Sequence, residues 1–159
     1  MHKKSIPFVI ILMVALIAAS IVYAANPHFK RQPTFTDLGT TLKTCLSLTG
    51  LGMENVTITV KTTGTATTLC TNPGGNTAPG QNKTPVSPSA EQTFPSTQIK
   101  NGNLSVCLTT PPPPNPTARE AGCPNSNWSA SITDVQFASA EIIVVQGNQT
   151  VLDQTFQLP

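Results

Sequence analysis

The chain has 159 residues, with nine Lys and Arg against seven Asp and Glu, so its formal net charge is +2. Two of these cations, Lys3 and Lys4, belong to an N-terminal segment that we expect to be removed, and the remainder is then formally neutral. A neutral chain offers no basic surface for nucleic acid, and we expect no nucleic-acid partner.

The first 24 residues have the pattern of an export signal. A positively charged start precedes an apolar run over residues 8–22, and small or modest residues at 22–24 precede a cut after Ala24. The alternative is a membrane tether through residues 7–24, because the run approaches the ~18 apolar residues of a spanning helix. We predict a signal peptide over residues 1–24 and a secreted, extracellular protein, with a membrane contact only if that segment is kept.

The elements expected next are a flexible lead-in over residues 25–36, which contains two prolines, and a strand over residues 42–48. A helical face competes for the latter, but threonines and flanking glycines favour a strand. The clearest strand is Val-Thr-Ile-Thr-Val at 56–60, typical of a sheet with one wet face. Residues 65–70 continue in extended form after Gly64, which marks a bulge or a hairpin turn.

The middle of the chain is rich in turn residues. Residues 71–95 predict a long loop, of a kind that is either functional or disordered. Strands at 97–99 and 104–108 flank Asn101-Gly102, a strong hairpin signal. The four prolines at 111–114 predict a stiff polyproline connector.

The last third alternates again, from Cys123 through Trp128 to Ile132, and a final strand pair at 140–145 and 151–158 surrounds Gly147-Asn148. Six to eight strands without a long helix predict an all-β fold, an antiparallel immunoglobulin-like sandwich stapled by disulfides. We expect one domain over residues 37–159.

Four cysteines in an exported chain argue for two disulfides, with three pairings possible. Cys45 and Cys107 each lie on the face opposite the aliphatic residues of their strand, so they could pair across neighbouring strands. Cys70 and Cys123 each stand at the edge of a loop, and closing that segment is worth roughly 4 kcal/mol. We therefore favour Cys70–Cys123 and Cys45–Cys107.

Residues for catalysis and metal binding are scarce. After the predicted cut His28 is the only histidine, and no two cysteines are closely spaced, which disfavours a Ser-His-Asp triad and a zinc site. Asp134, Glu141 and Asp153 could serve a hydrolase, but they fit solvated strand faces better. We predict no enzyme, no catalytic residue, no metal and no small-molecule cofactor.

Two features could support binding or modification. Trp128 fits a core residue better than a ligand platform, yet it is the candidate ligand contact. Five Asn-x-Ser/Thr sequences would be N-glycosylation sites if the host permits: Asn55, Asn82, Asn103, Asn127 and Asn148.

Two stretches, Cys-Thr-Asn-Pro-Gly-Gly-Asn-Thr-Ala-Pro-Gly-Gln-Asn at 70–82 and Gly-Cys-Pro-Asn-Ser-Asn-Trp at 122–128, resemble a group of small secreted bacterial β-sandwich-like proteins of uncharacterised function. The resemblance covers most of residues 48–145. It implies export, the sandwich fold and a Cys70–Cys123 pair, with Cys45 and Cys107 as additions of this chain. It implies no activity.

We therefore expect a secreted, non-enzymatic β-domain with a surface, matrix or interaction role. The alternative is an extracellular glycan- or peptide-binding module that uses Trp128 and the 71–95 loop, with an extracellular protein or polysaccharide as its partner.

Overall fold

The computed structural model describes residues 26–159, so the signal peptide predicted over residues 1–24 lies outside the described residues. Regular structure in this part is β throughout, apart from one short 3-10 helix, η1 (Ser96–Gln98). No helix within residues 26–159 is long and apolar enough to span a membrane.

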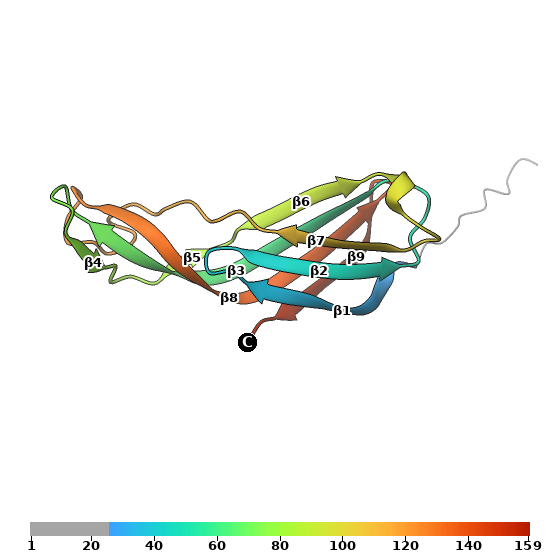
Figure 1. Ribbon diagram of the computed structural model, residues 1–159, viewed down its shortest axis with the longest axis horizontal. Coiled ribbons are helices and arrows are strands. Elements are labelled where there is room, and N and C mark those ends of the chain that lie inside the picture. Colours follow the sequence, from blue (N-terminus) through green and yellow to red (C-terminus); the bar gives the residue numbers. More distant parts are fainter. Residues whose placement is uncertain (1–25) are drawn as a thin grey trace, which may run out of the picture.

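The strands form two antiparallel sheets (Figure 1). The smaller sheet has the order β1-β2-β7. In the larger sheet β3 pairs with β8 along one edge and with β4, β5 and β6 along the other, and β9 lies beyond β8. The bounds are β1 (His28–Asp37), β2 (Leu42–Thr49), β3 (Val56–Thr71), β4 (Thr77–Pro79), β5 (Thr84–Val86), β6 (Ser89–Phe94), β7 (Leu104–Thr109), β8 (Ser129–Gln146) and β9 (Gln149–Gln157).

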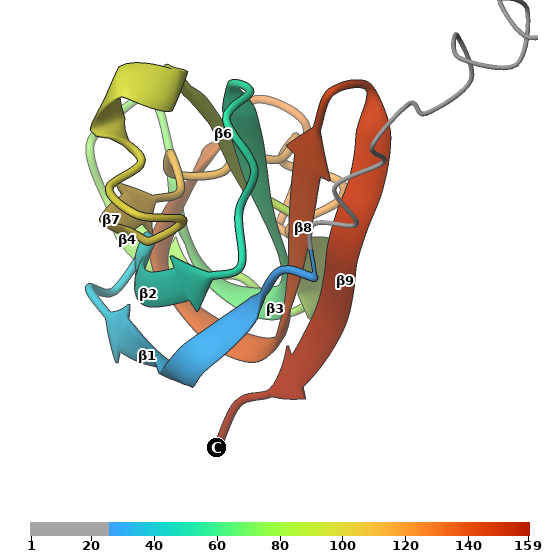
Figure 2. The same ribbon diagram turned by 90° about the vertical axis from the view of Figure 1, so that its right-hand side faces the viewer.

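The two sheets face each other over only part of the molecule. Figure 2, viewed along the long axis, shows β1 and β2 on one side and β8 and β9 on the other. The paired β3 and β8 run on past the sandwich and carry β4 at the far end (Figure 1). We call this far part, residues 66–84 and 111–134, the distal extension. The all-β, antiparallel sandwich predicted from the sequence is confirmed.

The alternation of β3 builds the core. Val56, Ile58 and Val60 are at most 1% exposed, whereas Thr57 and Thr59 face outward and hydrogen-bond across to β6. The wet face predicted for this strand is therefore present. The core between the sheets consists of buried aliphatic side chains and one phenylalanine: Leu46, Leu48, Leu51, Val56, Ile58, Val60, Phe94, Leu104, Leu108, Ile142 and Val144.

Gly64 marks a bulge, which decides between the two alternatives that the sequence left open. The register of β3 with β8 shifts between Thr63 and Gly64, and a Cβ on Gly64 would lie 2.6 Å from the Gln136 carbonyl oxygen. A larger side chain has no room there. On the bulged strand β8, Val135 and Phe137 still face inward and form a second small cluster.

The flexible lead-in expected over residues 25–36 is wrong, because His28–Asp37 forms β1 and pairs with β2. The prolines misled the prediction. Pro33 is tolerated because β1 is an edge strand whose pairing is irregular between Arg31 and Thr34. Two phenylalanines on β1, Phe29 and Phe35, contact Phe156 of β9 with ring centroids 5.6 and 5.5 Å apart.

The long loop expected over residues 71–95 is also wrong. Its residues follow β3 back along the sheet as three short strands, β4, β5 and β6, with prolines and glycines interrupting the pairing. This edge and β1 raise the strand count in the described part above the expected six to eight. The strand expected over residues 97–99 is not formed, because Thr97 and Gln98 lie in η1 and Ile99 follows directly after it. Asn101 and Gly102 form the predicted turn with positive φ.

Both disulfides have the predicted partners. Cys45 and Cys107 lie opposite each other across β2 and β7, with Cα atoms 4.0 Å apart. Cys70, near the end of β3, joins Cys123 in the loop before β8, with Cα atoms 5.7 Å apart. Two such bridges are expected of a protein from an oxidising, extracellular-type environment.

The core assignment predicts a difference between two neighbouring isoleucines on β8. Ile142→Ala should lower the free energy of unfolding by about 2–5 kcal/mol, because Ile142 is fully buried and its loss leaves a cavity. Ile143→Ala is the matched control on the outer face and should cost less than half as much. Urea unfolding with both disulfides intact measures both values; equal losses would contradict this placement of the core.

Candidate functional site

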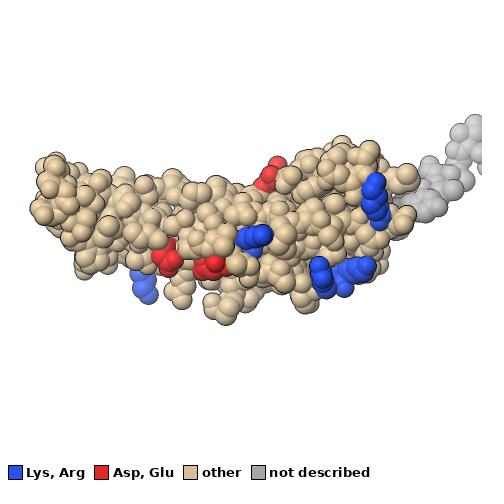
Figure 3. All heavy atoms as spheres, in the orientation of Figure 1, with Lys and Arg blue, Asp and Glu red and all other residues tan. Residues whose placement is uncertain are grey.

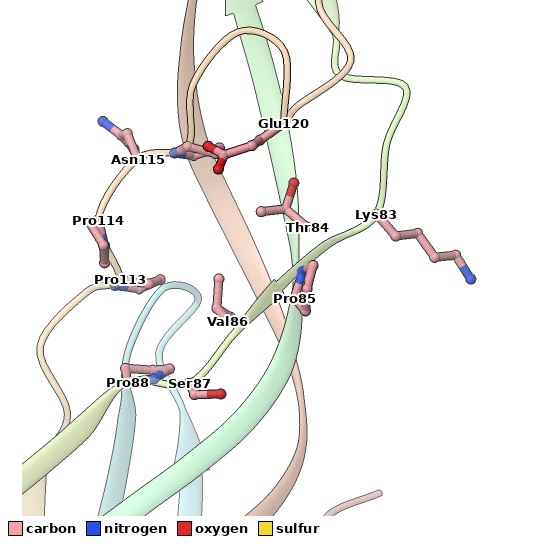
Figure 4. A pocket seen from close by; sticks show the side chains of 11 residues that line it. Lys83, Thr84, Pro85, Val86, Ser87, Pro88, Pro113, Pro114, Asn115 and Glu120 are labelled. Carbon is pink, nitrogen blue, oxygen red and sulfur yellow. The ribbon is translucent and has the colours of Figure 1, made fainter.

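A groove of about 610 Å³ lies where the sandwich meets the distal extension (Figure 4). One wall is β5 with its flanking residues, and the other is the proline segment after β7. The groove is lined by Lys83, Thr84, Pro85, Val86, Ser87, Pro88, Pro113, Pro114, Asn115, Pro116 and Glu120. Residues 83–88 and 113–120 are distant in sequence and meet only in the folded chain.

Prolines make the walls of this groove apolar and stiff. Five of the lining residues are proline, and each has its φ fixed by the pyrrolidine ring. The segment over residues 111–116 has neither helix nor strand, as the polyproline prediction implied. Asn115 fixes it to β8, because the Asn115 Oδ1 accepts a hydrogen bond of 2.9 Å from the Ile132 backbone N–H.

Thr84 places a hydroxyl group at the floor of the groove. Its residue is only 9% exposed, and its Oγ1 has no hydrogen-bond partner among the described residues, a property shared with Thr44 and Thr68 away from the groove. Figure 4 shows this hydroxyl pointing along the groove toward the Glu120 end. Because this oxygen is closed off from solvent, it is an unsatisfied polar group inside the wall of the groove and not a contact that a ligand in the groove can reach.

Glu120 gives this end of the groove a negative charge. Its Oε2 accepts hydrogen bonds from the Thr117 backbone N–H and from the Thr117 hydroxyl, both at 2.8 Å. These bonds favour the carboxylate form and lower the pKa of Glu120 below its ordinary value. Lys83, on the other wall, points away from the groove (Figure 4). The charge that faces the groove is therefore an anion.

Further hydrogen bonds hold the two walls of the groove together. Asn82 donates its side-chain amide to the carbonyl oxygens of Arg119 and Glu120, at 3.3 and 3.1 Å, and its backbone N–H donates to the Ala121 carbonyl. Cys123 of the Cys70–Cys123 bridge follows Ala121 by only two residues, so the disulfide fixes the same segment. The groove is thus built on cross-linked backbone and not on a free loop.

Trp128, the candidate ligand contact, lies apart from the groove. It directly precedes β8 on the distal extension, is half-buried, and belongs to neither cluster of buried core residues. The two clusters of buried apolar residues therefore form without Trp128. Part of its surface is open to solvent.

The acidic residues singled out in the sequence do not converge on the groove. Glu141 is 3.7 Å from the Lys61 Nζ on the outer face of the large sheet, while Asp134 and Asp153 are exposed on β8 and β9. His28 is exposed at the start of β1, and its Nδ1 pairs with the Asn26 carbonyl at 2.9 Å. Within residues 26–159 no cluster of His, Cys, Asp and Glu could hold a metal ion.

The five Asn-x-Ser/Thr sites differ in the hydrogen bonds that their side-chain amide nitrogens donate. Asn55, Asn127 and Asn148 are exposed. The Asn82 amide nitrogen bridges the groove walls, and that of Asn103 donates to the carbonyl oxygens of Lys100 and Asn101. A glycan on either of the last two would disturb these contacts.

Sequence reasoning missed the groove residues Thr84, Glu120 and Pro113. Two signals were present: the density of prolines at 85–88 and at 111–116, and the Thr-x-x-Glu spacing at 117–120, which allows reciprocal side-chain to backbone bonds. Neither signal says that the two segments meet.

A scan of protein-family models found no match to this chain, and a search of curated proteins found none either. The resemblance to small secreted bacterial proteins stays a prediction.

The unpartnered hydroxyl predicts an unusual gain in stability. Thr84→Val should raise the free energy of unfolding by about 1 kcal/mol, because it removes a buried polar group that lacks a protein partner. Thr62→Val is the matched control: the Thr62 hydroxyl donates to the Pro88 carbonyl at 2.8 Å, and its loss should cost about 1 kcal/mol. Urea unfolding measures both; a loss at Thr84 as large as that at Thr62 would refute the assignment.

The two bonds from Thr117 predict how Glu120 titrates. Thr117→Val removes the hydroxyl donor and should raise the pKa of Glu120 part of the way to its ordinary value, since the backbone donor remains. NMR titration of the carboxyl carbon reads this shift. Because the folded-state pKa is the lower one, the stabilisation is present at neutral pH and fades as the pH falls through that value. Thr109→Val, at an exposed position on β7, should leave the titration unchanged.

Proposed function

We propose that this protein is an exported, non-enzymatic β-sandwich with an interaction role at the cell surface or in the extracellular matrix, and that the proline-lined groove is its contact site. The observation that carries the proposal is the groove, because it combines rigid apolar walls with a carboxylate at one end. The predicted signal peptide and the two disulfides support export.

The chemistry of the groove favours a peptide segment that carries Lys or Arg. Pyrrolidine rings offer flat apolar surface to an aliphatic or aromatic side-chain stem, and Glu120 offers a carboxylate to a cation at one end. Addition of a ligand strand to the β5 edge is disfavoured, since Pro85 has no N–H to donate. The groove would therefore recognise the side chains of the ligand and not its backbone.

Charge supports a protein partner over a nucleic acid. Figure 3 shows that most of this face is uncharged, with acidic and basic residues scattered among neutral ones. A phosphate backbone is bound through clustered Lys and Arg, whereas the charge directed into the groove is negative.

The arrangement of acidic groups supports a non-catalytic role. A carboxyl that acts as a general acid at neutral pH needs its pKa raised, as happens on burial. The pKa of Glu120 is shifted in the opposite direction, and the group is exposed. Asp134, Glu141 and Asp153 lie outside the groove.

A second candidate is glycan binding through Trp128. The position of this residue outside both core clusters favours it, because Trp128 is partly exposed and an exposed aromatic surface can stack on a sugar. The two candidates use different sites, so one experiment separates them.

The mature protein is tested against an array of short peptides with and without Lys or Arg, and against a panel of soluble polysaccharides. We expect retention of the basic peptides, weakened about two- to fivefold in Glu120→Gln, because Glu120 is exposed and water screens its pairing with a cation. Trp128→Ala should leave peptide retention unchanged. Polysaccharide retention that is lost in Trp128→Ala would replace the groove by the glycan candidate, and retention of neither class would refute both.

A further inference from the structure

The two disulfides differ in their access to solvent. Cys70 is fully buried, so the Cys70–Cys123 bridge is shielded on one side by the protein. Cys107 is exposed and Cys45 is half-buried, and both lie on the outer face of the small sheet, away from the core. A reactant in solution can therefore reach the Cys45–Cys107 bridge first.

A hollow of about 460 Å³ opens beside this exposed bridge. It is lined by both cysteines and by Arg31, Gln32, Thr34, Leu46, Ser105 and Val106. The hollow lies where the pairing of β1 with β2 is irregular, between Arg31 and Thr34, and Thr34 is the register partner of Cys45. Arg31 is the only charged residue in the lining. A cation next to a cysteine favours its thiolate form.

The strands that carry this bridge are also held together by backbone pairing and by apolar packing. β2 and β7 pair continuously from Lys43 opposite Thr109 to Leu48 opposite Leu104. The main core contains four leucines of these strands: Leu46, Leu48, Leu104 and Leu108. The Cys70–Cys123 bridge instead ties down residues 111–128, which contain no strand. We therefore expect the fold to survive opening of the exposed bridge, and the distal extension to loosen when the buried one is opened.

We propose that the Cys45–Cys107 disulfide is a site of thiol–disulfide exchange, at which a thiol-bearing molecule becomes covalently attached to this protein. An incoming thiolate attacks the exposed Sγ of Cys107, the bond between the two Sγ atoms breaks, and its electron pair leaves on the Sγ of Cys45. The products are a mixed disulfide on Cys107 and a Cys45 thiolate that Arg31 stabilises. A second thiolate can then attack the mixed disulfide at the sulfur of the incoming molecule and release Cys107. The products are the free thiols of Cys45 and Cys107 and a disulfide formed from two molecules of the incoming thiol.

The test exposes the mature, folded protein to graded concentrations of reduced glutathione at neutral pH without denaturant. After alkylation of free thiols, peptide mass spectrometry reports which cysteines are free and which carry glutathione. We expect Cys45 and Cys107 to react at least about tenfold faster than Cys70 and Cys123, with glutathione on Cys107. Equal rates for the two bridges, or faster opening of Cys70–Cys123, would overturn the proposal.

Two sets of variants separate reactivity from folding. Arg31→Gln should slow the exchange several-fold, whereas Arg119→Gln, at an exposed arginine of the distal extension, should not. An Arg31→Gln rate equal to that of the unaltered protein would remove the cation from the mechanism. The double variant Cys45→Ser, Cys107→Ser should keep a cooperative unfolding transition; its failure to fold would make the bridge structural and refute the proposed site.

Discussion

The antiparallel pairing of β3 with β8 is the interaction on which the rest of this structure depends. It runs from Val56 opposite Gln146 to Thr71 opposite Ser129, and it is interrupted only by two register shifts. Toward the sandwich its inward side chains are large and aliphatic, and they form one half of the core. Toward the distal extension they are smaller, such as Ala66, Thr68 and Cys70. One continuous ribbon therefore serves a hydrophobic core at one end and a cross-linked extension at the other.

The central strands could be predicted from the sequence because their burial follows the period of two that a half-buried strand imposes, as at Val56, Ile58 and Val60. The alternation of side chains along β2 and β7 likewise predicted that Cys45 and Cys107 point to the same outer face and can pair. The edge strands could not be predicted, since β1 and β5 contain proline and are held by their partners in space rather than by local preference. The groove was out of reach for the same reason: Thr84 and Glu120 come together only through the return of the chain along β3.

The distal extension shows how a small protein holds a region that has no hydrophobic core of its own. Its buried residues are small, among them Ala118 and Ala121. Stability there comes from the Cys70–Cys123 bridge, from the Asn82 amide and from the hydrogen bonds of the turn at Thr117. Such contacts fix the position of backbone more strictly than apolar packing does, because each requires a defined direction. A surface built on such contacts is held in one shape by the fold itself.

The uninterrupted length of β3 also sets the reach of the molecule. Sixteen residues in strand conformation span about 50 Å. The described chain begins beside the end of β2, at the end of the sandwich where β3 starts, whereas the distal extension lies at the opposite end (Figure 1). The ribbon therefore separates the start of the described chain from the groove, which lies beside the middle of β3, and still farther from Trp128, which lies next to the residue paired with the end of β3.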